Sequence, residues 1–175
     1  MILEHKDHIA GLITDATRQV FETMIPLDVT LGEVYVDKKD PGPSAGVVSL
    51  VGLVGSWVGT GSFSCSPEMA CKLASALLMA DYSAMNEEVL DALAEVANMI
   101  IGNVKTGLEE TLGPMGLSIP TVIFGRNFTT RSVGNSDWIV VPFFHGEERM
   151  EIQICLAPHK GGNTVPRFWM AGIEA

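Results

Sequence analysis

The chain has 175 residues, of which 47% are hydrophobic and 18% charged, so it can form one domain with a buried core and is not typical of a disordered protein. Its formal net charge of −10 argues against nucleic acid and anionic membranes as partners, because both need basic surfaces. Glycines and polar residues interrupt the longest apolar stretch, so no membrane-spanning helix is expected.

The N-terminal segment contains acidic residues where a secretory signal would need a basic start and an apolar centre. The three cysteines, Cys65, Cys71 and Cys155, lack CxxC spacing and are odd in number. We therefore expect a cytoplasmic protein with reduced, buried thiols. His5 and His8 have no third ligand nearby at zinc spacing, so we expect a solvated N-terminus there and no metal site.

The first third of the chain predicts a helix followed by strands. Residues 9–25 have apolar positions at helical spacing and end at Pro26, which indicates an amphipathic helix. Residues 27–36 alternate in hydrophobicity and predict one half-buried strand, and residues 37–44 form a charged loop broken by proline and glycine.

The next residues give the strongest strand signal in the sequence. Two apolar or β-branched runs, 45–54 and 57–64, are joined by Gly55-Ser56, which predicts a hairpin with a two-residue turn of the Gly-X kind. Ser66 then provides a capping hydroxyl before a first-turn proline, so a helix is expected from Pro67 to about Ala80.

The rest of the chain is organised around a long predicted helix over residues 85–113. Asn86 is a suitable N-cap, Glu87 and Glu88 lie near the positive end of the helix dipole, and Gly113 can end the helix. One face of this helix is apolar and is expected to pack on the core: Val89, Leu93, Val96, Ala97, Ile100, Val104 and Leu108.

A second face of the same helix carries Asp91, Glu95, Asn98, Gly102 and Lys105, spaced by three and four residues and pointing away from the core. We call these five residues the polar stripe. A glycine inside a helix costs about 1 kcal/mol relative to alanine. Gly102 therefore indicates close approach of another surface, a tight crossing with a neighbouring helix, or simple tolerance. Taken alone, the carboxylate and carboxamide of the stripe have an ordinary interpretation as a solvated helix face, although such a pair can bind a partner's cation and orient a water.

The remaining elements complete a sheet. Strands are expected at 117–124, broken early by Pro120, and at 138–144 and 150–157 around a hairpin loop, with a polar loop or irregular edge strand at 125–136. The order of elements, with short turns between strands, predicts an α+β fold in which a mostly antiparallel sheet packs with helices.

The segment from Asp91 to Lys105, DALAEVANMIIGNVK, resembles the signature helix of the CheC/CheX/FliY chemotaxis phosphatases, written D/S-x3-E-x2-N. The upstream hairpin and helix are similar as well, so the resemblance covers roughly residues 9–157. Pro120 follows Asn98 by 22 positions, one residue nearer than the family's downstream proline. The first helix has Gln19 and Glu22 where a second glutamate–asparagine pair would stand, so the chain resembles single-site CheX more than two-site CheC.

The resemblance implies an aspartyl-phosphate protein phosphatase that acts on a phosphorylated CheY-type receiver of two-component signalling. In that family the glutamate pairs with a lysine in the receiver and the asparagine orients the attacking water; here these catalytic residues are Glu95 and Asn98. It also implies that Asp91, Gly102 and Lys105 contact the partner. The resemblance implies no cofactor bound by this chain and Mg²⁺ in the receiver. It also implies a homodimer, because CheX-like proteins look like homodimers joined through their sheets.

We expect a single CheX-like domain over residues 1–157 and a C-terminal extension over 158–175, whose structure the sequence does not assign. The alternative function is a non-catalytic receiver- or flagellar-switch-binding adaptor of the same fold, although the presence of both Glu95 and Asn98 favours the enzyme. A third possibility is a small-ligand sensor that uses the extension as a lid. The sequence identifies neither the response regulator nor the pathway.

Overall fold

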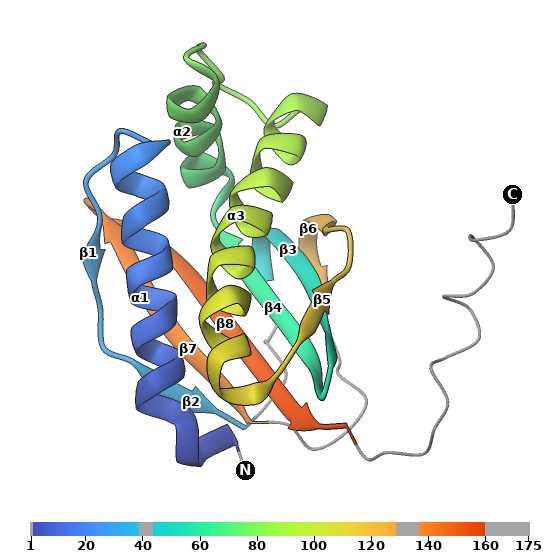
Figure 1. Ribbon diagram of the computed structural model, residues 1–175. Helices are drawn as coiled ribbons and strands as arrows, with labels where there is room; N and C mark the ends of the chain where they lie inside the picture. Colours follow the sequence, from blue (N-terminus) through green and yellow to red (C-terminus); the bar gives the residue numbers. More distant parts are fainter. Residues whose placement is uncertain (1, 39–43, 129–136, 160–175) are drawn as a thin grey trace, which may run out of the picture.

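The computed structural model describes residues 2–38, 44–128 and 137–159. One antiparallel sheet carries two long helices, α1 and α3, side by side on one face, and α2 packs beside α3 (Figure 1). The elements in chain order are η1 (Ile2–His5), α1 (Lys6–Thr23), β1 (Thr30–Leu31), β2 (Tyr35–Asp37), β3 (Ser44–Gly55), β4 (Trp57–Cys65), α2 (Pro67–Leu78), α3 (Glu87–Leu112), β5 (Met115–Leu117), β6 (Thr121–Phe128), β7 (Trp138–His145) and β8 (Glu148–Pro158).

In the part of the chain that the structure describes, all strand pairs of the sheet are antiparallel, but only β3–β4 and β7–β8 are consecutive hairpins, and the other neighbours are joined by longer connections. Its strand order is β1-β7-β8-β4-β3-β5, with β2 also paired to β7 and β6 also paired to β3. The central pairs are long, since β4 pairs with β8 along its whole length and with β3 from Val58 to Cys65. The predicted α+β fold with a mostly antiparallel sheet is confirmed.

Helix α3 lies against the sheet through its apolar face. All seven residues predicted for that face are at most 1% exposed. Gly61 of β4 lets the helix come close, because a Cβ at this position would lie 2.7 Å from Cδ1 of Ile101. The main core therefore lies between α1 and α3 on one side and the central strands on the other.

The predicted helix ends are confirmed by their hydrogen bonds. Ser66 Oγ accepts from the backbone amide of Met69 at 3.0 Å, and Asn86 Oδ1 accepts from the amide of Val89 at 2.9 Å. Gly113 follows the last residue of α3 with φ of 83°, a left-handed conformation that favours glycine. The polar stripe therefore lies on a helix whose two ends are both fixed.

Two predictions about the N-terminal third are wrong. The strand predicted over 27–36 is split into the short strands β1 and β2, both paired to β7, and Leu31 is 41% exposed although the alternation placed it inside. The solvated N-terminus is instead helical from Ile2, which is 5% exposed, and the ring of His5 packs edge-on against Trp57. His8 is exposed, as expected.

The β3–β4 hairpin is confirmed, but its turn differs from the predicted kind. Val54 and Val58 are the last directly paired residues of the hairpin, so three residues rather than two lie between them, and the backbone φ of Gly55 is not positive. Gly55 has a different role, because a Cβ there would lie 2.2 Å from the carbonyl oxygen of Pro114. The glycine allows the chain leaving α3 to pass close to the hairpin.

The strand predicted from 117 to 124 is present in two pieces. β5 begins earlier, at Met115, residues 118–120 interrupt the pairing, and β6 continues to Phe128. The structure describes the first four residues of the segment 125–136, predicted from the sequence as a polar loop or irregular edge strand, and all four belong to β6. Residues 129–136 and 160–175, which include most of the predicted extension, lie outside the described residues.

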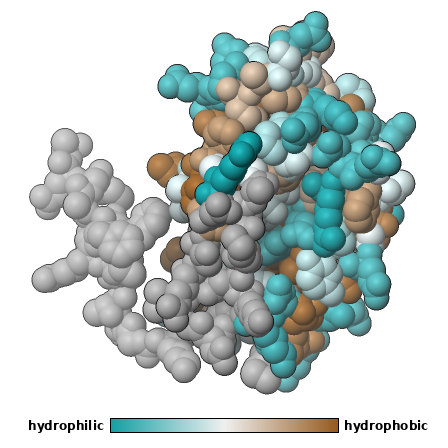
Figure 2. All heavy atoms as spheres, turned by 180° about the vertical axis from the view of Figure 1, so that it is seen from behind, coloured by the Kyte–Doolittle hydropathy of each residue, from teal (hydrophilic) through white to brown (hydrophobic). Residues whose placement is uncertain are grey.

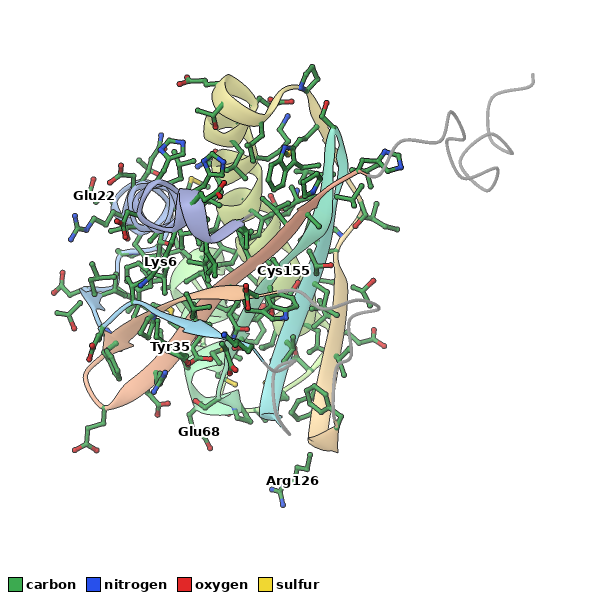
Figure 3. All side chains as sticks on the ribbon, turned by 90° about the horizontal axis from the view of Figure 1, so that it is seen from below. Lys6, Glu22, Tyr35, Glu68, Arg126 and Cys155 are labelled. Carbon is green, nitrogen blue, oxygen red and sulfur yellow. The ribbon has the colours of Figure 1, made fainter. Side chains whose placement is uncertain are left out.

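The opposite face of the sheet is a mixture of hydrophilic and hydrophobic residues (Figure 2). Trp138, Val140 and Cys155 form a small buried cluster there, separate from the main core. Tyr35 and Cys155 mark this side of the sheet in Figure 3, and the hydroxyl of Tyr35 donates to Glu151 at 3.0 Å. None of the three cysteines forms a disulfide and all are buried, as predicted, and burial raises the pKa of the Cys65 thiol.

Candidate active site

The polar stripe follows the side of α3 that borders β5 and β6. Near its C-terminal end, the carboxylate of Glu109 accepts a hydrogen bond from the backbone amide of Met115 at 2.9 Å. Two turns earlier, a Cβ built on Gly102 would lie 3.7 Å from Cδ1 of Leu117. In the direction of the N-terminus of α3, the polar stripe therefore runs first beside β5 and then towards β6. Asn98 and Glu95 are the next stripe residues after Gly102 in this direction.

Glu95 and Asn98 lie one turn apart at the surface. Glu95 is exposed and Asn98 is half-buried, so neither side chain is enclosed by the surrounding structure. Neither makes a hydrogen bond or an ion pair with another side chain or backbone group in the described part of the chain. A carboxylate can pair with a cation, and a carboxamide can both donate and accept a hydrogen bond. The pair is thus an accessible set of polar groups carried by the backbone of a helix of 26 residues.

Asp91 extends this surface by one further turn and is exposed. The stripe thus places two carboxylates, those of Asp91 and Glu95, on one face of the N-terminal half of α3. This local negative charge favours a partner that presents a cation.

Gly102 is not required by packing within the described residues. The contact of a Cβ with Leu117 would be an ordinary van der Waals distance. The tight helix crossing lies instead at Gly107, where a Cβ would come within 2.4 Å of Leu12 on α1. The interpretation of Gly102 as a helix-crossing residue is therefore wrong, which leaves close approach of another surface or tolerance.

Lys105 is already engaged within the chain. Its Nζ lies 2.9 Å from the carboxylate of Glu109, one turn further along the helix. The backbone amide of Met115 and, to a smaller extent, Lys105 lower the pKa of Glu109. These contacts hold the C-terminal part of the stripe against β5, and a role of Lys105 in partner contact would require it to exchange this ion pair.

The corresponding face of α1 has no such pair. Gln19 and Glu22 are both exposed, and Glu22 points outward from the helix in Figure 3. Within residues 2–38, 44–128 and 137–159, no group of three or more His, Cys, Asp or Glu is placed to hold a metal ion. In the same residues, no helix is long and apolar enough to cross a membrane.

A hollow of about 660 Å³ lies between the end of α2 and the link to α3, with Met79, Tyr82 and Met85 among its lining residues. Neither Glu95 nor Asn98 lines it. The extension that the small-ligand sensor would use as a lid lies almost wholly outside the described residues, so that possibility stays a prediction. The polar stripe is the better candidate for a functional site, because it presents Glu95 and Asn98 together on an accessible face of α3.

Sequence reasoning missed one feature beside the stripe, the link 118–120 between β5 and β6. Ser118 bonds to the backbone of Gly52, and Ile119 is 86% exposed. The only signal in the sequence was an isoleucine directly before Pro120, because the residue before a proline favours extended backbone.

The arrangement of helices and sheet matches a known family. The family model described as "Chemotaxis phosphatase CheX" matches residues 47–144, which is more than half of the chain and includes the whole of α3. The chain belongs to the CheX family. A curated CheX from Thermotoga maritima, named "CheY-P phosphatase CheX", is 32% identical over 89 residues, which are 50% of this chain and 57% of that protein. The chain thus spans somewhat more than half the length of this curated relative.

Solved CheX structures extend the likeness over most of the chain. A chemotaxis protein CheX from Desulfovibrio desulfuricans is 29% identical with a TM-score of 0.76, covering 86% of this chain and 99% of that one. The CheX of Borrelia burgdorferi, solved in a complex with CheY, BeF3 and Mg²⁺, is 27% identical with a TM-score of 0.71, covering 83% and 96%. These likenesses confirm the predicted family and fold.

Proposed function

We propose that this CheX-family chain dephosphorylates the aspartyl phosphate of a CheY-type receiver, with Asn98 orienting the attacking water and Glu95 docking to the receiver's lysine. The observation that carries the proposal is the accessible pair itself, one turn apart on α3 and unengaged by the described residues. Two relatives support it: the Thermotoga CheX is named a CheY-P phosphatase, and the Borrelia CheX is solved with a CheY.

In the proposed reaction, the oxygen of a water forms a bond to phosphorus as the bond between phosphorus and the aspartyl oxygen breaks. The products are the receiver's free carboxylate and inorganic phosphate, and the proton of the water passes to the phosphate. Little covalent chemistry is needed from the catalyst, so positioning decides the rate. The carboxamide of Asn98 suits this task because its oxygen accepts from the water while its nitrogen donates, as a water-positioning glutamine does in GTP hydrolysis.

Glu95 is proposed to hold the receiver rather than to react. An exposed ion pair contributes about 0.2–1 kcal/mol, and the contribution grows when docking removes water from the pair. Asp91 would add negative charge next to this contact, and Lys105 would act at the rim. Each of these roles follows from the family resemblance together with the accessible position of the stripe.

Mg²⁺ is proposed to be part of the receiver, where it would neutralise charge on the phosphoryl oxygens. The polar stripe is not proposed as its ligand set, since Asp91 and Glu95 are the only carboxylates of the stripe and no group of three or more His, Cys, Asp or Glu in the described residues is placed to hold a metal ion. We also propose that the chain forms a homodimer and acts in the cytoplasm, where it would encounter the receiver. Size-exclusion chromatography with light scattering would test the dimer.

The activity is tested by following the decay of phosphorylated CheY-type receivers from the source organism after addition of the wild-type chain and of Glu95→Gln. We expect faster decay with one or more receivers, and a higher KM for Glu95→Gln, which keeps the size of the side chain but removes its charge. Tight binding of a phosphorylated receiver without faster decay would instead support the adaptor function. Unchanged decay of every receiver would contradict the proposal.

A further inference from the structure

Ile119 is exposed to an unusual degree for an isoleucine. It is 86% exposed, and among the exposed large hydrophobic side chains of the described residues only Met79 exceeds it. Single exposed apolar side chains are common on protein surfaces. Ile119 differs from such residues in two respects: hydrogen bonds hold the backbone of the link that carries it, and it lies beside the polar stripe.

The backbone that presents Ile119 is held by three hydrogen bonds. The amide of Ser118 donates to the carbonyl of Gly52 at 2.9 Å, and the amide of Gly52 donates to the hydroxyl oxygen of Ser118 at 2.8 Å. The same hydroxyl donates to the carbonyl of Ile119 at 2.9 Å. Pro120 fixes its own φ directly afterwards. The backbone that carries the side chain is therefore held in place while the side chain faces water, which lowers the backbone entropy lost when a partner covers it.

Contacts between α3 and the sheet place Ile119 near Asn98. At one end, a Cβ on Gly113 would contact Ser56 in the β3–β4 turn; further along, a Cβ on Gly102 would contact Leu117. The helix and the strand edge thus run alongside each other from the turn towards β6, as Figure 1 shows for α3, β5 and β6. Asn98 is one turn beyond Gly102, and Ile119 is two residues beyond Leu117 in the same direction.

Phe124 extends the same edge. It is 49% exposed and pairs in register with Val47, whose side chain lies in the main core beneath the helices. Directly paired residues of neighbouring strands point to the same face of a sheet, so Phe124 lies on the face covered by α3. The strand edge beside the polar stripe therefore carries two exposed apolar side chains.

We propose that Ile119, assisted by Phe124, is a docking contact for the receiver and sets its register against Asn98. The inference rests on the proposed function, because the occupant is the receiver surface around the aspartyl phosphate. The strand edge adjoins the polar stripe, so the apolar contact is continuous with it and a receiver docked on Asn98 can cover both. A second copy of this chain fits less well, because Asp91 and Glu95 would face another chain with a net charge of −10.

The test compares the wild type with Ile119→Ser and with a control, Met79→Ser, which removes an even more exposed apolar side chain from the end of α2. Binding to receivers loaded with BeF3⁻ and Mg²⁺ is measured by calorimetry, and KM and kcat are measured where decay is accelerated. For Ile119→Ser we expect Kd and KM to rise by about tenfold, with kcat within about twofold and an unchanged melting temperature. Met79→Ser should bind as the wild type does.

Equal weakening by both substitutions, or no weakening by Ile119→Ser, would overturn the inference. Loss of self-association in Ile119→Ser with normal receiver binding would also overturn it, by showing that a second copy covers this edge. The binding measurement separates this inference from the proposed function. Weaker receiver binding by Ile119→Ser supports the docking contact even if the wild type does not accelerate decay, which would contradict the phosphatase proposal alone.

Discussion

Replacing Gly102 by alanine should make the protein more stable and should slow the proposed dephosphorylation of the receiver. A mid-helix glycine costs about 1 kcal/mol relative to alanine. No steric strain offsets this gain in stability, because the new Cβ would contact only Cδ1 of Leu117, at 3.7 Å. For a chain of this size, 1 kcal/mol corresponds to a rise in melting temperature of about 2–4 °C.

The expected loss of activity has a different origin. If a docked receiver lies against Gly102, the added methyl enters a packed interface, and overpacking of this kind costs about 1–3 kcal/mol. Since about 1.4 kcal/mol corresponds to tenfold, kcat/KM should fall roughly 5- to 150-fold. The assays are thermal unfolding and receiver dephosphorylation on the same preparations.

Gly11→Ala is the matched control. Gly11 also lies within a helix, α1, and nothing lies within 4 Å of a Cβ built there. It should give a similar gain in stability and leave the dephosphorylation rate unchanged. A Gly102→Ala protein that is stabilised and fully active would refute the clearance role. A destabilised Gly102→Ala protein would contradict the packing described around it.

Two further predictions concern stability. Met79 is the C-cap of α2, with φ of 52°, and its side chain is 92% exposed. Met79→Gly therefore relieves a strained left-handed conformation and removes little buried surface, so the free energy of unfolding measured in urea titrations should rise by about 1 kcal/mol. A decrease would show that the methionine side chain stabilises the fold. The pKa of Glu109 is lowered in the fold from its ordinary value of 4.5, so the ionised carboxylate stabilises the folded state at pH values above 4.5. This stabilisation is lost as the pH falls through the lowered pKa. The wild type should therefore melt at a higher temperature than Glu109→Gln at about pH 6, and this difference should shrink as the pH is lowered to about 3. A constant difference would count against stabilisation by the Glu109 carboxylate.

Local signals in the sequence were sufficient for α2 and α3, although they missed the helical start of the chain at Ile2. Ser66 and Asn86 are caps whose hydrogen bonds form as expected, and the apolar face of α3 is buried. These features depend on residues close in sequence, namely caps, first-turn charges and helical spacing. The polar stripe follows from the same spacing, so its accessible placement could also be predicted.

Features set by contacts distant in sequence could not be predicted. The sequence predicted Gly55 as a turn glycine, but the structure requires glycine there because the carbonyl oxygen of Pro114 leaves no room for a Cβ. The strand over 27–36 is split because each piece pairs separately with β7. Similarly, the fixed link that exposes Ile119 depends on Gly52, which is far from it along the chain. In each case the partner could not be identified from local sequence.

The roles of Glu95 and Asn98 came from the family resemblance rather than from their chemistry. A carboxylate and a carboxamide one turn apart are ordinary on a helix surface, and their spacing alone predicts no reaction. The structure adds that both are accessible and that neighbouring described residues do not engage them. The catalytic assignment itself stays a prediction.

The most direct test of the account is the single-turnover decay of a phosphorylated receiver saturated with Asn98→Ala. If Asn98 positions the water, the decay constant should fall by about 10²–10³ relative to the wild type, while the Kd for the receiver changes by less than about threefold. The half-buried position on a capped helix suggests that the variant will fold, which circular dichroism would verify. A folded Asn98→Ala protein that dephosphorylates the bound receiver at the wild-type rate would contradict the central claim.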